Sequence, residues 1–354
     1  MKQEISIYLD LVRFSAALLV LVYHTYGRGI TGGFLWQISS YGHTAVIVFF
    51  VLSGYVIGFV AHSKEKTISE FLAARASRLY SVVFPAVILT FACNEFGRYF
   101  ILDIYNGPWN EDEPNKYLRY IAALLMLQNI WGVDLSPTNN GVFWSLSYEF
   151  FYYLFFATLF YMRGKRKIIL LFLLAAIAGP AIVSLFPIWG LGYLAYRFHF
   201  SNKVVLHPKV ALLLFILSLI ILIASPTYRG LVNYKAPVIR GTALLDYIDG
   251  IAFFVHLLVA PIVVKKISKM LVMTREVIVF MSSMTFSLYL FHLPLVRLFA
   301  GISPFIDKPS SYANIIFVYL MTIFVILLLG IPVERSKYWY KKWFRGIFDG
   351  VGQR

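Results

Sequence analysis

Apolar runs long enough to cross a lipid bilayer limit the folds open to this chain more than any other feature. A transmembrane helix needs about 20 predominantly apolar residues. Hydrophobic residues make up 60% of the chain and charged residues 14%, whereas about a quarter of the residues in a soluble domain are charged. The sequence therefore predicts an all-α polytopic membrane protein with about ten transmembrane helices, at 5–26, 43–61, 79–97, 145–162, 168–185, 187–200, 210–225, 241–264, 275–298 and 314–333.

The first run, 5–26, predicts a retained span rather than a cleaved signal peptide. It is too long for a signal-peptide core, it has no small-residue cleavage site, and it contains Asp10 and Arg13. Another apolar run, 120–130, is shorter than the usual minimum of about 17 residues.

The formal charge of +15 would suggest nucleic acid as the partner of a soluble protein. Here we interpret it as a topology signal and expect no nucleic-acid partner. If the N-terminus is cytoplasmic and the run 120–130 does not cross, most of the 32 Lys and Arg residues fall on cytoplasmic segments, as the positive-inside rule requires. We therefore expect both termini in the cytoplasm and a re-entrant or interfacial element at 119–143, between the third and fourth spans. Such backbone must be covered by protein or line a cavity, so we also expect a cavity that opens outward.

Residues 1–354 are expected to form one membrane domain, without a soluble domain at either end. The tail 334–354 is basic and aromatic, which favours a helix on the inner leaflet in contact with lipid. The outer segment 94–143 is acidic. Cys93, the single cysteine, excludes an internal disulfide and a multi-cysteine metal site, and we expect no bound metal.

Three ionisable residues lie in the first span, where such residues are functional candidates. Asp10 and Arg13 are three positions apart and can pair on one helical face. Arg13 and His24 are eleven positions apart, almost three turns, so they share a face at about 16 Å along the axis. This places His24 in the outer half of the membrane. Taken alone, a histidine in a span is more often satisfied by a helix–helix hydrogen bond. The motifs described next favour a functional role for His24 instead.

The second span contains Phe50 and the sequence Ser53-Gly54-Tyr55. Small residues commonly let helices approach closely. Alternatively, Gly54 admits a ligand or a neighbouring backbone while Ser53 and Tyr55 supply hydroxyls.

Two arginines, Arg75 and Arg78, lie three positions apart at the start of the third span. Guanidinium groups bind phosphate oxygens in a bidentate manner, so this pair suggests a phosphate clamp. Ordinary positive-inside anchoring is the alternative.

The fourth span begins with Trp144, Ser147 and Glu149. Glu149 is a carboxylate at the outer edge of the membrane, where it could orient His24 or bind sugar hydroxyls. An interfacial aromatic belt explains Trp144 equally well, but it does not explain Glu149.

Tyr289 and His292 share a face near the outer end of the ninth span, where His292 could contact substrate or form a helix-end hydrogen bond. Asp246 and Asp249 could contact an acceptor or pair with Arg240 or nearby hydroxyls. No motif surrounds the remaining histidines, most of which we interpret as interfacial: His43, His62, His199, His207 and His256.

Taken together, these motifs resemble the membrane-bound acyltransferase-3 family. The matching elements occur in family order: Leu9-Asp10-Leu11-Val12-Arg13 with His24, the FFVLSGY block at 49–55, Arg75-x-x-Arg78, Trp144-Ser-Leu-Ser-x-Glu149, and SLYLFHLP at 287–294. The resemblance implies ten spans with cytoplasmic termini in a bacterial inner membrane. It also implies transfer of an acyl group, usually acetyl, from cytoplasmic acyl-CoA to a carbohydrate hydroxyl on or beyond the outer leaflet. Expected acceptors are exopolysaccharide or lipopolysaccharide units, including lipid-linked oligosaccharides. Some members carry an extra soluble esterase-like domain after the last spans. None is expected in this sequence, so the membrane domain would complete transfer alone or pass its acyl group to a separate partner.

The residues and the resemblance together predict a mechanism. Arg75 and Arg78 hold the phosphates of acyl-CoA, a co-substrate rather than a tightly bound cofactor. The pantetheine arm passes Arg13 and the Ser53–Gly54 surface. His24, steered by Glu149 or less favourably by Asp10, acts as general base for the sugar hydroxyl. A covalent acyl-histidine is the alternative, and the oxyanion would be held by Ser53, Tyr55 or backbone N–H groups.

Two other classes of protein remain open. A transporter or flippase of lipid-linked sugar also has buried charges and re-entrant segments, but no inverted repeat or paired broken helices are evident in the sequence. The third class, a non-catalytic membrane receptor, does not explain why Arg13, His24 and Glu149 occur together. The oligomeric state is open, and a homodimer stays possible.

Overall fold

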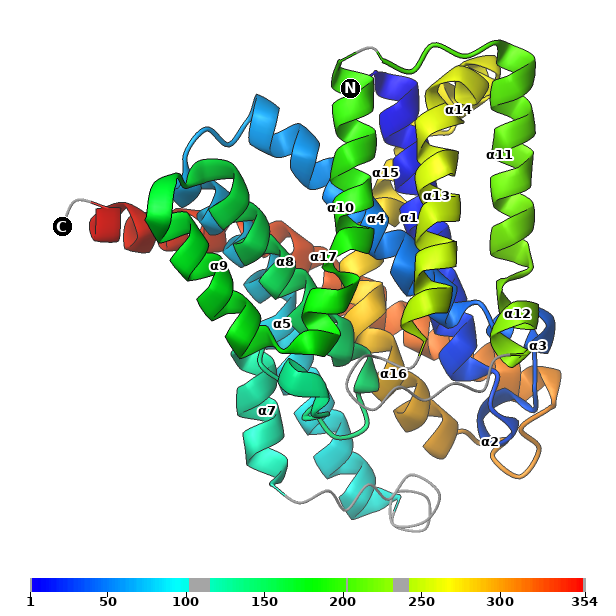
Figure 1. The fold of residues 1–354 in the computed structure, drawn as a ribbon. Helices are drawn as coiled ribbons and strands as arrows, with labels where there is room; N and C mark the ends of the chain where they lie inside the picture. The colour runs from blue at the N-terminus through cyan, green and yellow to red at the C-terminus, as the bar shows by residue number, and fades with distance from the viewer. Residues whose placement is uncertain (1, 102–114, 202, 232–241, 353–354) are drawn as a thin grey trace.

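The computed structural model describes residues 2–101, 115–201, 203–231 and 242–352, and all regular structure within these ranges is helical. The sequence prediction of an all-α protein is therefore confirmed (Figure 1). The longer helices are α1 (Gln3–Thr25), α4 (Gly42–Ser63), α5 (Ile68–Phe100), α8 (Trp144–Tyr161), α9 (Gly164–Ala178), α10 (Pro180–Phe200), α11 (Pro208–Ile223), α13 (Ala243–Val264), α16 (Thr285–Gly301) and α17 (Tyr312–Gly352). The short elements are α2 (Arg28–Thr31), α3 (Trp36–Ser39), α7 (Lys116–Leu124), α12 (Ser225–Leu231), α14 (Ser268–Met273) and α15 (Arg275–Ser283), with 3-10 turns η1 (Ile130–Gly132), η2 (Gly141–Phe143) and η3 (Lys265–Ile267).

Among the described residues, the number of helices suited to cross a membrane is smaller than the predicted ten. Six helices are long and apolar enough, or up to eight if the bent pairs α11–α12 and α15–α16 each form one span. The predicted spans at 145–162 and 168–185 correspond mainly to α8 and α9, which are not among them. Helix α9 has 15 residues, about 22 Å of helix, which is less than the roughly 30 Å thickness of the hydrocarbon core.

The boundary between the predicted fifth and sixth spans is also displaced. The sequence suggests a break near Pro187, but Pro187 lies inside α10. The chain breaks instead at Gly179, whose φ of +80° suits glycine, and Pro180 then starts α10. Proline is well tolerated in the first turn because the N–H that it lacks would have no intrahelical partner there.

The helices form two groups. Helix α4 packs against α1, α10 and α13, and α11 covers α13, while α5, α16 and α17 pack together beside α8 and α9. Figure 1 shows the first group standing upright and much of the second inclined beside it. Helices α1 and α16, and helices α8 and α10, make contacts between the two groups.

Glycines make the α4–α10 contact unusually close. A Cβ atom on Gly54 would lie 2.0 Å from the carbonyl oxygen of Trp189, and one on Gly192 would lie 1.8 Å from the carbonyl oxygen of Val51. Only glycine on both helices allows this approach of the two backbones.

The segment after α7 turns into the protein instead of continuing as a helix. Helix α7 has nine residues, in agreement with the prediction that the run 120–130 does not cross. Buried amides beyond it bond to the surrounding helices: Asn140 donates to Thr90 Oγ1 of α5 (2.8 Å) and to the carbonyl oxygen of Leu290 of α16 (3.0 Å). These side-chain hydrogen bonds tie the irregular segment to α5 and α16, and at membrane depth such backbone must be covered by protein or line a cavity. Part of the acidic segment, 102–114, lies outside the described residues.

The tail predicted to begin at residue 334 continues α17 without a break, through Pro332. It lies against the start of α5, where Arg345 pairs with Glu70 (3.1 Å) and Ser69 bonds to Asp349 (2.5 Å). The start of α5 is itself well defined, because Thr67 and Glu70 form a capping box.

Candidate functional site

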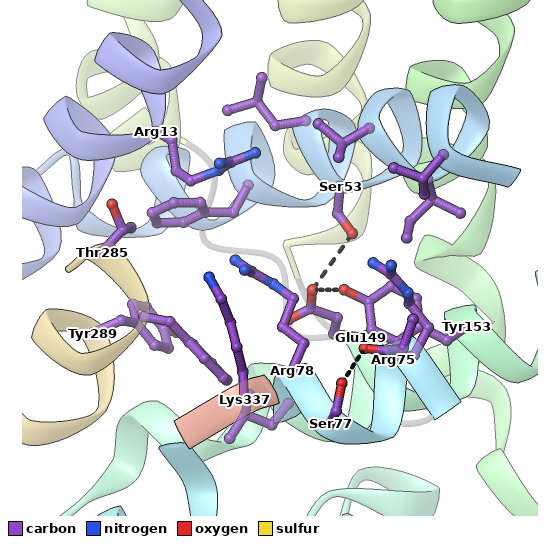
Figure 2. A pocket seen from close by; sticks show the side chains of 18 of the residues that line it. Arg13, Ser53, Arg75, Ser77, Arg78, Glu149, Tyr153, Thr285, Tyr289 and Lys337 are labelled. Carbon is purple, nitrogen blue, oxygen red and sulfur yellow. Dashed lines mark hydrogen bonds between the residues drawn. The ribbon is translucent and has the colours of Figure 1, made fainter. Parts of the chain in front are cut away.

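A cavity of about 610 Å³ lies between the two helix groups, lined by side chains from α1, α4, α5, α8, α16 and α17 (Figure 2). Its volume is in the range usual for small-molecule sites. Along α4 the lining runs from Val46 to Lys64, which corresponds to about 27 Å of helix axis. The cavity is therefore elongated. One end is polar, near the α4–α5 connection, and the other end is formed by Phe49, Ser145 and Tyr289.

Arg13 projects into the cavity from α1. Its Nη1 bonds to Asp10 Oδ1 at 3.2 Å, so the predicted pair is formed. Ser282 also donates to Asp10 Oδ1 (2.9 Å). Asp10 therefore binds Arg13 and Ser282. Among the described residues it forms no hydrogen bond with His24, for which the sequence had made it the weaker candidate partner.

Both predicted clamp arginines line the cavity, but their environments differ. Arg75 Nη2 bonds to Glu65 Oε1 at 2.7 Å, and its guanidinium lies over the rings of Phe71 and Tyr153 (5.5 and 5.8 Å to the centroids). Arg78 lies over the ring of Phe286 at 5.7 Å. Arg75 is thus paired with Glu65, whereas the guanidinium group of Arg78 points into the cavity (Figure 2).

Glu149 lies within the cavity wall rather than beside His24. Its Oε1 accepts hydrogen bonds from Tyr153 and from Ser53 Oγ (3.5 Å), and Ser53 Oγ accepts one from Trp189 Nε1 (3.1 Å). Figure 2 shows these hydroxyls converging on Glu149. Among the described residues, Glu149 and His24 form no hydrogen bond or ion pair, so the predicted contact between them is absent.

His24 lies one residue before the end of α1 and does not line the cavity. Its ring centroid is 5.2 Å from that of His292 on α16. His292 is fully buried, and its Nδ1 is 2.9 Å from the carbonyl oxygen of Leu288. Since a carbonyl only accepts, Nδ1 carries a proton, and in the neutral ring Nε2 is then the acceptor. That Nε2 is buried and has no hydrogen-bond partner among the described residues.

Tyr289 lies between the cavity and this histidine pair. Its hydroxyl is 2.8 Å from Ser145 Oγ. Its ring centroid is 5.9 Å from that of Phe49 and 6.5 Å from that of His292. Tyr289 and His292, predicted to share a face, therefore have different surroundings: Tyr289 borders the cavity and His292 contacts His24.

Besides Asp10, His24 and His292, four further predicted site residues lie away from the cavity. Gly54 faces the α10 backbone, and the Tyr55 hydroxyl is 2.9 Å from His199 Nδ1. Ser147 accepts a hydrogen bond from the backbone of the segment after α7, at 3.2 Å from Asn129 N. Trp144 lies nearly parallel to the ring of His43, with centroids 6.2 Å apart. Of the remaining predictions, Ser53 and Phe50 do line the cavity.

Comparison with known proteins identifies the family. The sequence profile described as an acyltransferase domain matches residues 6–333. This chain belongs to the acyltransferase-3 family. The O-acetyl transferase of Shigella phage Sf6 is 28% identical over 214 residues, which are 56% of this chain and 62% of the phage protein, so the match spans less than two thirds of that relative. No solved structure matches this chain.

The protein also contains a polar cluster that was not evident from sequence. Asp246 and Asp249 of α13 both bond to Arg229 of α12 (2.8 and 2.5 Å), and Asp246 also contacts His43 Nε2 (2.7 Å). The expected partner Arg240 lies outside the described residues. His43, interpreted from sequence as interfacial, is instead the α4 member of this cluster. Its position at the start of an apolar span was the available signal.

Sequence reasoning also missed three cavity residues in the C-terminal tail: Lys337, Tyr338 and Lys341 of α17. The i, i+4 spacing of the two lysines places them on one helical face, but nothing in that spacing shows what the face contacts. Within the described ranges, no group of three or more His, Cys, Asp or Glu side chains is arranged to hold a metal ion.

Proposed function

We propose that this acyltransferase moves an acyl group, above all acetyl, from acyl-CoA to a hydroxyl of a cell-surface or lipid-linked polysaccharide. The observation that carries the proposal is the elongated cavity, which has cations along its walls and, at the end formed by Phe49, Ser145 and Tyr289, approaches the half-buried His24 and the buried His292. Acyl-CoA has the matching form, with phosphates at one end and a thioester on a long flexible arm. The relative named as an O-acetyl transferase supports oxygen as the acceptor atom.

The charged end of the cavity suits the donor. Arg78 points into the cavity near Lys337, opposite Arg13 (Figure 2), and charge-assisted contacts of this kind bind phosphates strongly. The pantetheine arm would follow α4 past Ser53 and Phe50. In this proposal the charged end faces the cytoplasm of a bacterial inner membrane, and the basic connections between the predicted spans support that orientation.

His24 acts in this proposal as the general base, and His292 replaces Glu149 as its positioning residue. The Nε2 lone pair of His292 would accept the N–H of His24 and leave the other His24 nitrogen free to take a proton. The acceptor hydroxyl loses its proton to His24 as its oxygen attacks the thioester carbonyl. A C–O ester bond forms, the C–S bond breaks, and the proton passes from His24 to the CoA thiolate.

In this proposal Tyr289 controls access to His24 and donates a hydrogen bond to the oxyanion. Because Tyr289 and Phe49 separate the cavity from His24, the thioester reaches the histidine when the Tyr289 ring moves aside. The hydroxyls of Tyr289 and Ser145 lie at this end. They are better placed than Tyr55 to donate to the developing oxyanion.

The experiment combines acetyl-CoA, an extracted glycan acceptor and the purified protein, with free CoA thiol and acetylated glycan as readouts. His24→Ala should abolish both products and leave CoA binding intact, and Tyr23→Phe, on the neighbouring α1 position, serves as the matched control. Retained activity in His24→Ala would exclude His24 as the base. A transporter or flippase of lipid-linked sugar, the alternative supported by the two bent helix pairs, would release no CoA from acetyl-CoA.

A further inference from the structure

The C-terminal half of α17 borders the polar end of the cavity. Lys337, Tyr338 and Lys341 belong to the cavity lining, although the match to the acyltransferase family ends at residue 333. Lys337 and Lys341 lie one turn apart, about 6 Å along the helix. Two cations and an aromatic ring from the tail therefore face the site.

The charge balance of the cavity shows which cations are available to a ligand. Arg13 is paired with Asp10, and Arg75 with Glu65. In contrast, four cations of the lining form no salt bridge with any described residue: Lys64, Arg78, Lys337 and Lys341. The lining carboxylates are Glu65 and Glu149, against six lining cations, so a net positive charge remains. Net positive charge in a concave site attracts anions.

A smaller cavity of about 190 Å³ adjoins the main one at this end. The two share Lys64, Glu65 and Lys341, and the smaller one adds Arg345 and Glu70, which pair with each other at 3.1 Å. Lys341 therefore lies where the cavities meet, while Lys337 lines only the larger cavity, near Arg78.

We propose that α17 supplies the nucleotide half of the acyl-CoA site. Lys337 and Arg78 bind the diphosphate, and Lys341 with Lys64 binds the 3′-phosphate, which carries about two negative charges near neutral pH. The ring of Tyr338, 75% exposed, stacks on the adenine, as aromatic side chains do with bases. This inference rests on the proposed function and assigns the donor phosphates chiefly to α17, whereas Arg75 remains a positioning residue held by Glu65.

The test uses the full-length protein and a series of truncated donors. Lys337→Gln and Lys341→Gln are compared with the control variant Lys342→Gln. Lys342 follows Lys341 on α17, but it lines neither cavity. Each variant is assayed with acetyl-CoA, with 3′-dephospho-acetyl-CoA and with S-acetylpantetheine. The binding of CoA itself is measured separately, so that the site is tested without turnover.

We expect Lys341→Gln to raise the KM for acetyl-CoA about tenfold at unchanged kcat, because it contacts a group remote from the thioester. This penalty should disappear with 3′-dephospho-acetyl-CoA. The Lys337→Gln penalty should persist with that donor and disappear with S-acetylpantetheine. Tyr338→Ala should weaken CoA binding, and Lys342→Gln should match the wild type.

Other outcomes separate this inference from the proposed function. If the wild type transfers acetyl but the α17 variants bind CoA like Lys342→Gln, the nucleotide site is misplaced and the function stands. Penalties that stay equal across all three donors would also overturn the assignment. If CoA binds through Lys337 and Lys341 but no acetyl is transferred, the nucleotide site is supported and the proposed transfer reaction is wrong.

Discussion

The close contact of α4 with α10 leads to a quantitative prediction for Gly192→Ala. The new Cβ would lie 1.8 Å from the carbonyl oxygen of Val51, whereas ordinary contacts begin at about 3.4 Å. The clashing atom belongs to the backbone, so no side-chain rotation can relieve it. The helices must separate by roughly 1.6 Å, the difference between these distances, and overpacking of this kind costs about 1–3 kcal/mol.

Gly190→Ala provides the matched control for this substitution. Gly190 lies on the same helix, two residues away, and a Cβ there meets nothing within 4 Å. Both substitutions gain the same helix propensity, about 1 kcal/mol for Gly to Ala. The difference between the two variants therefore isolates the clash.

Thermal unfolding of the purified proteins in detergent, followed by tryptophan fluorescence, measures this difference. Gly192→Ala should unfold at a temperature several degrees below that of Gly190→Ala. It should also raise the KM for acetyl-CoA, because the displaced α10 carries Trp189, which donates to Ser53 in the cavity wall. Equal unfolding temperatures would refute the close helix contact, and with it the structural role assigned to Gly54.

Three further predictions concern the site. His292→Ala should lower kcat about a hundredfold, as loss of an orienting partner does, at unchanged KM for acetyl-CoA; a KM increase alone would contradict a positioning role. Tyr289→Phe keeps the ring and removes the hydroxyl, so single-turnover transfer should slow about a hundredfold if that hydroxyl holds the oxyanion; a wild-type rate would exclude it. Glu65→Gln should lower the unfolding temperature, because it leaves buried Arg75 unpaired, and adding Arg75→Gln should restore part of that loss; an additive loss would argue against the pair.

The sequence alone determined the membrane class and the helical fold, and it singled out most of the residues to which the proposed function assigns a role. These are local properties: a run of apolar side chains must avoid water wherever it lies in the fold, and an ionisable residue inside such a run is conspicuous without a structure. The Asp10–Arg13 pair was predictable for the same reason, since a helix places positions three apart on one face. Charge patterning likewise indicated that the run 120–130 is not a span.

Only the tertiary structure decided which neighbours these residues meet. Adjacent residues on a helix point about 100° apart, so Ser53 faces the cavity while Gly54 and Tyr55 face α10, although all three belong to one motif. Hydropathy did not distinguish spans of full length from α8 and α9, nor did it place the break at Gly179.

The partners of the central charges were equally beyond the sequence, because contacts between distant helices depend on how the helices pack. Glu149 accepts hydrogen bonds from Ser53 and Tyr153. The ring of His24 lies beside that of His292 and not beside Glu149. The tail 334–354 was conspicuous from its basic and aromatic residues, but only the packing of α17 against α5 brought Lys337 and Lys341 to the cavity.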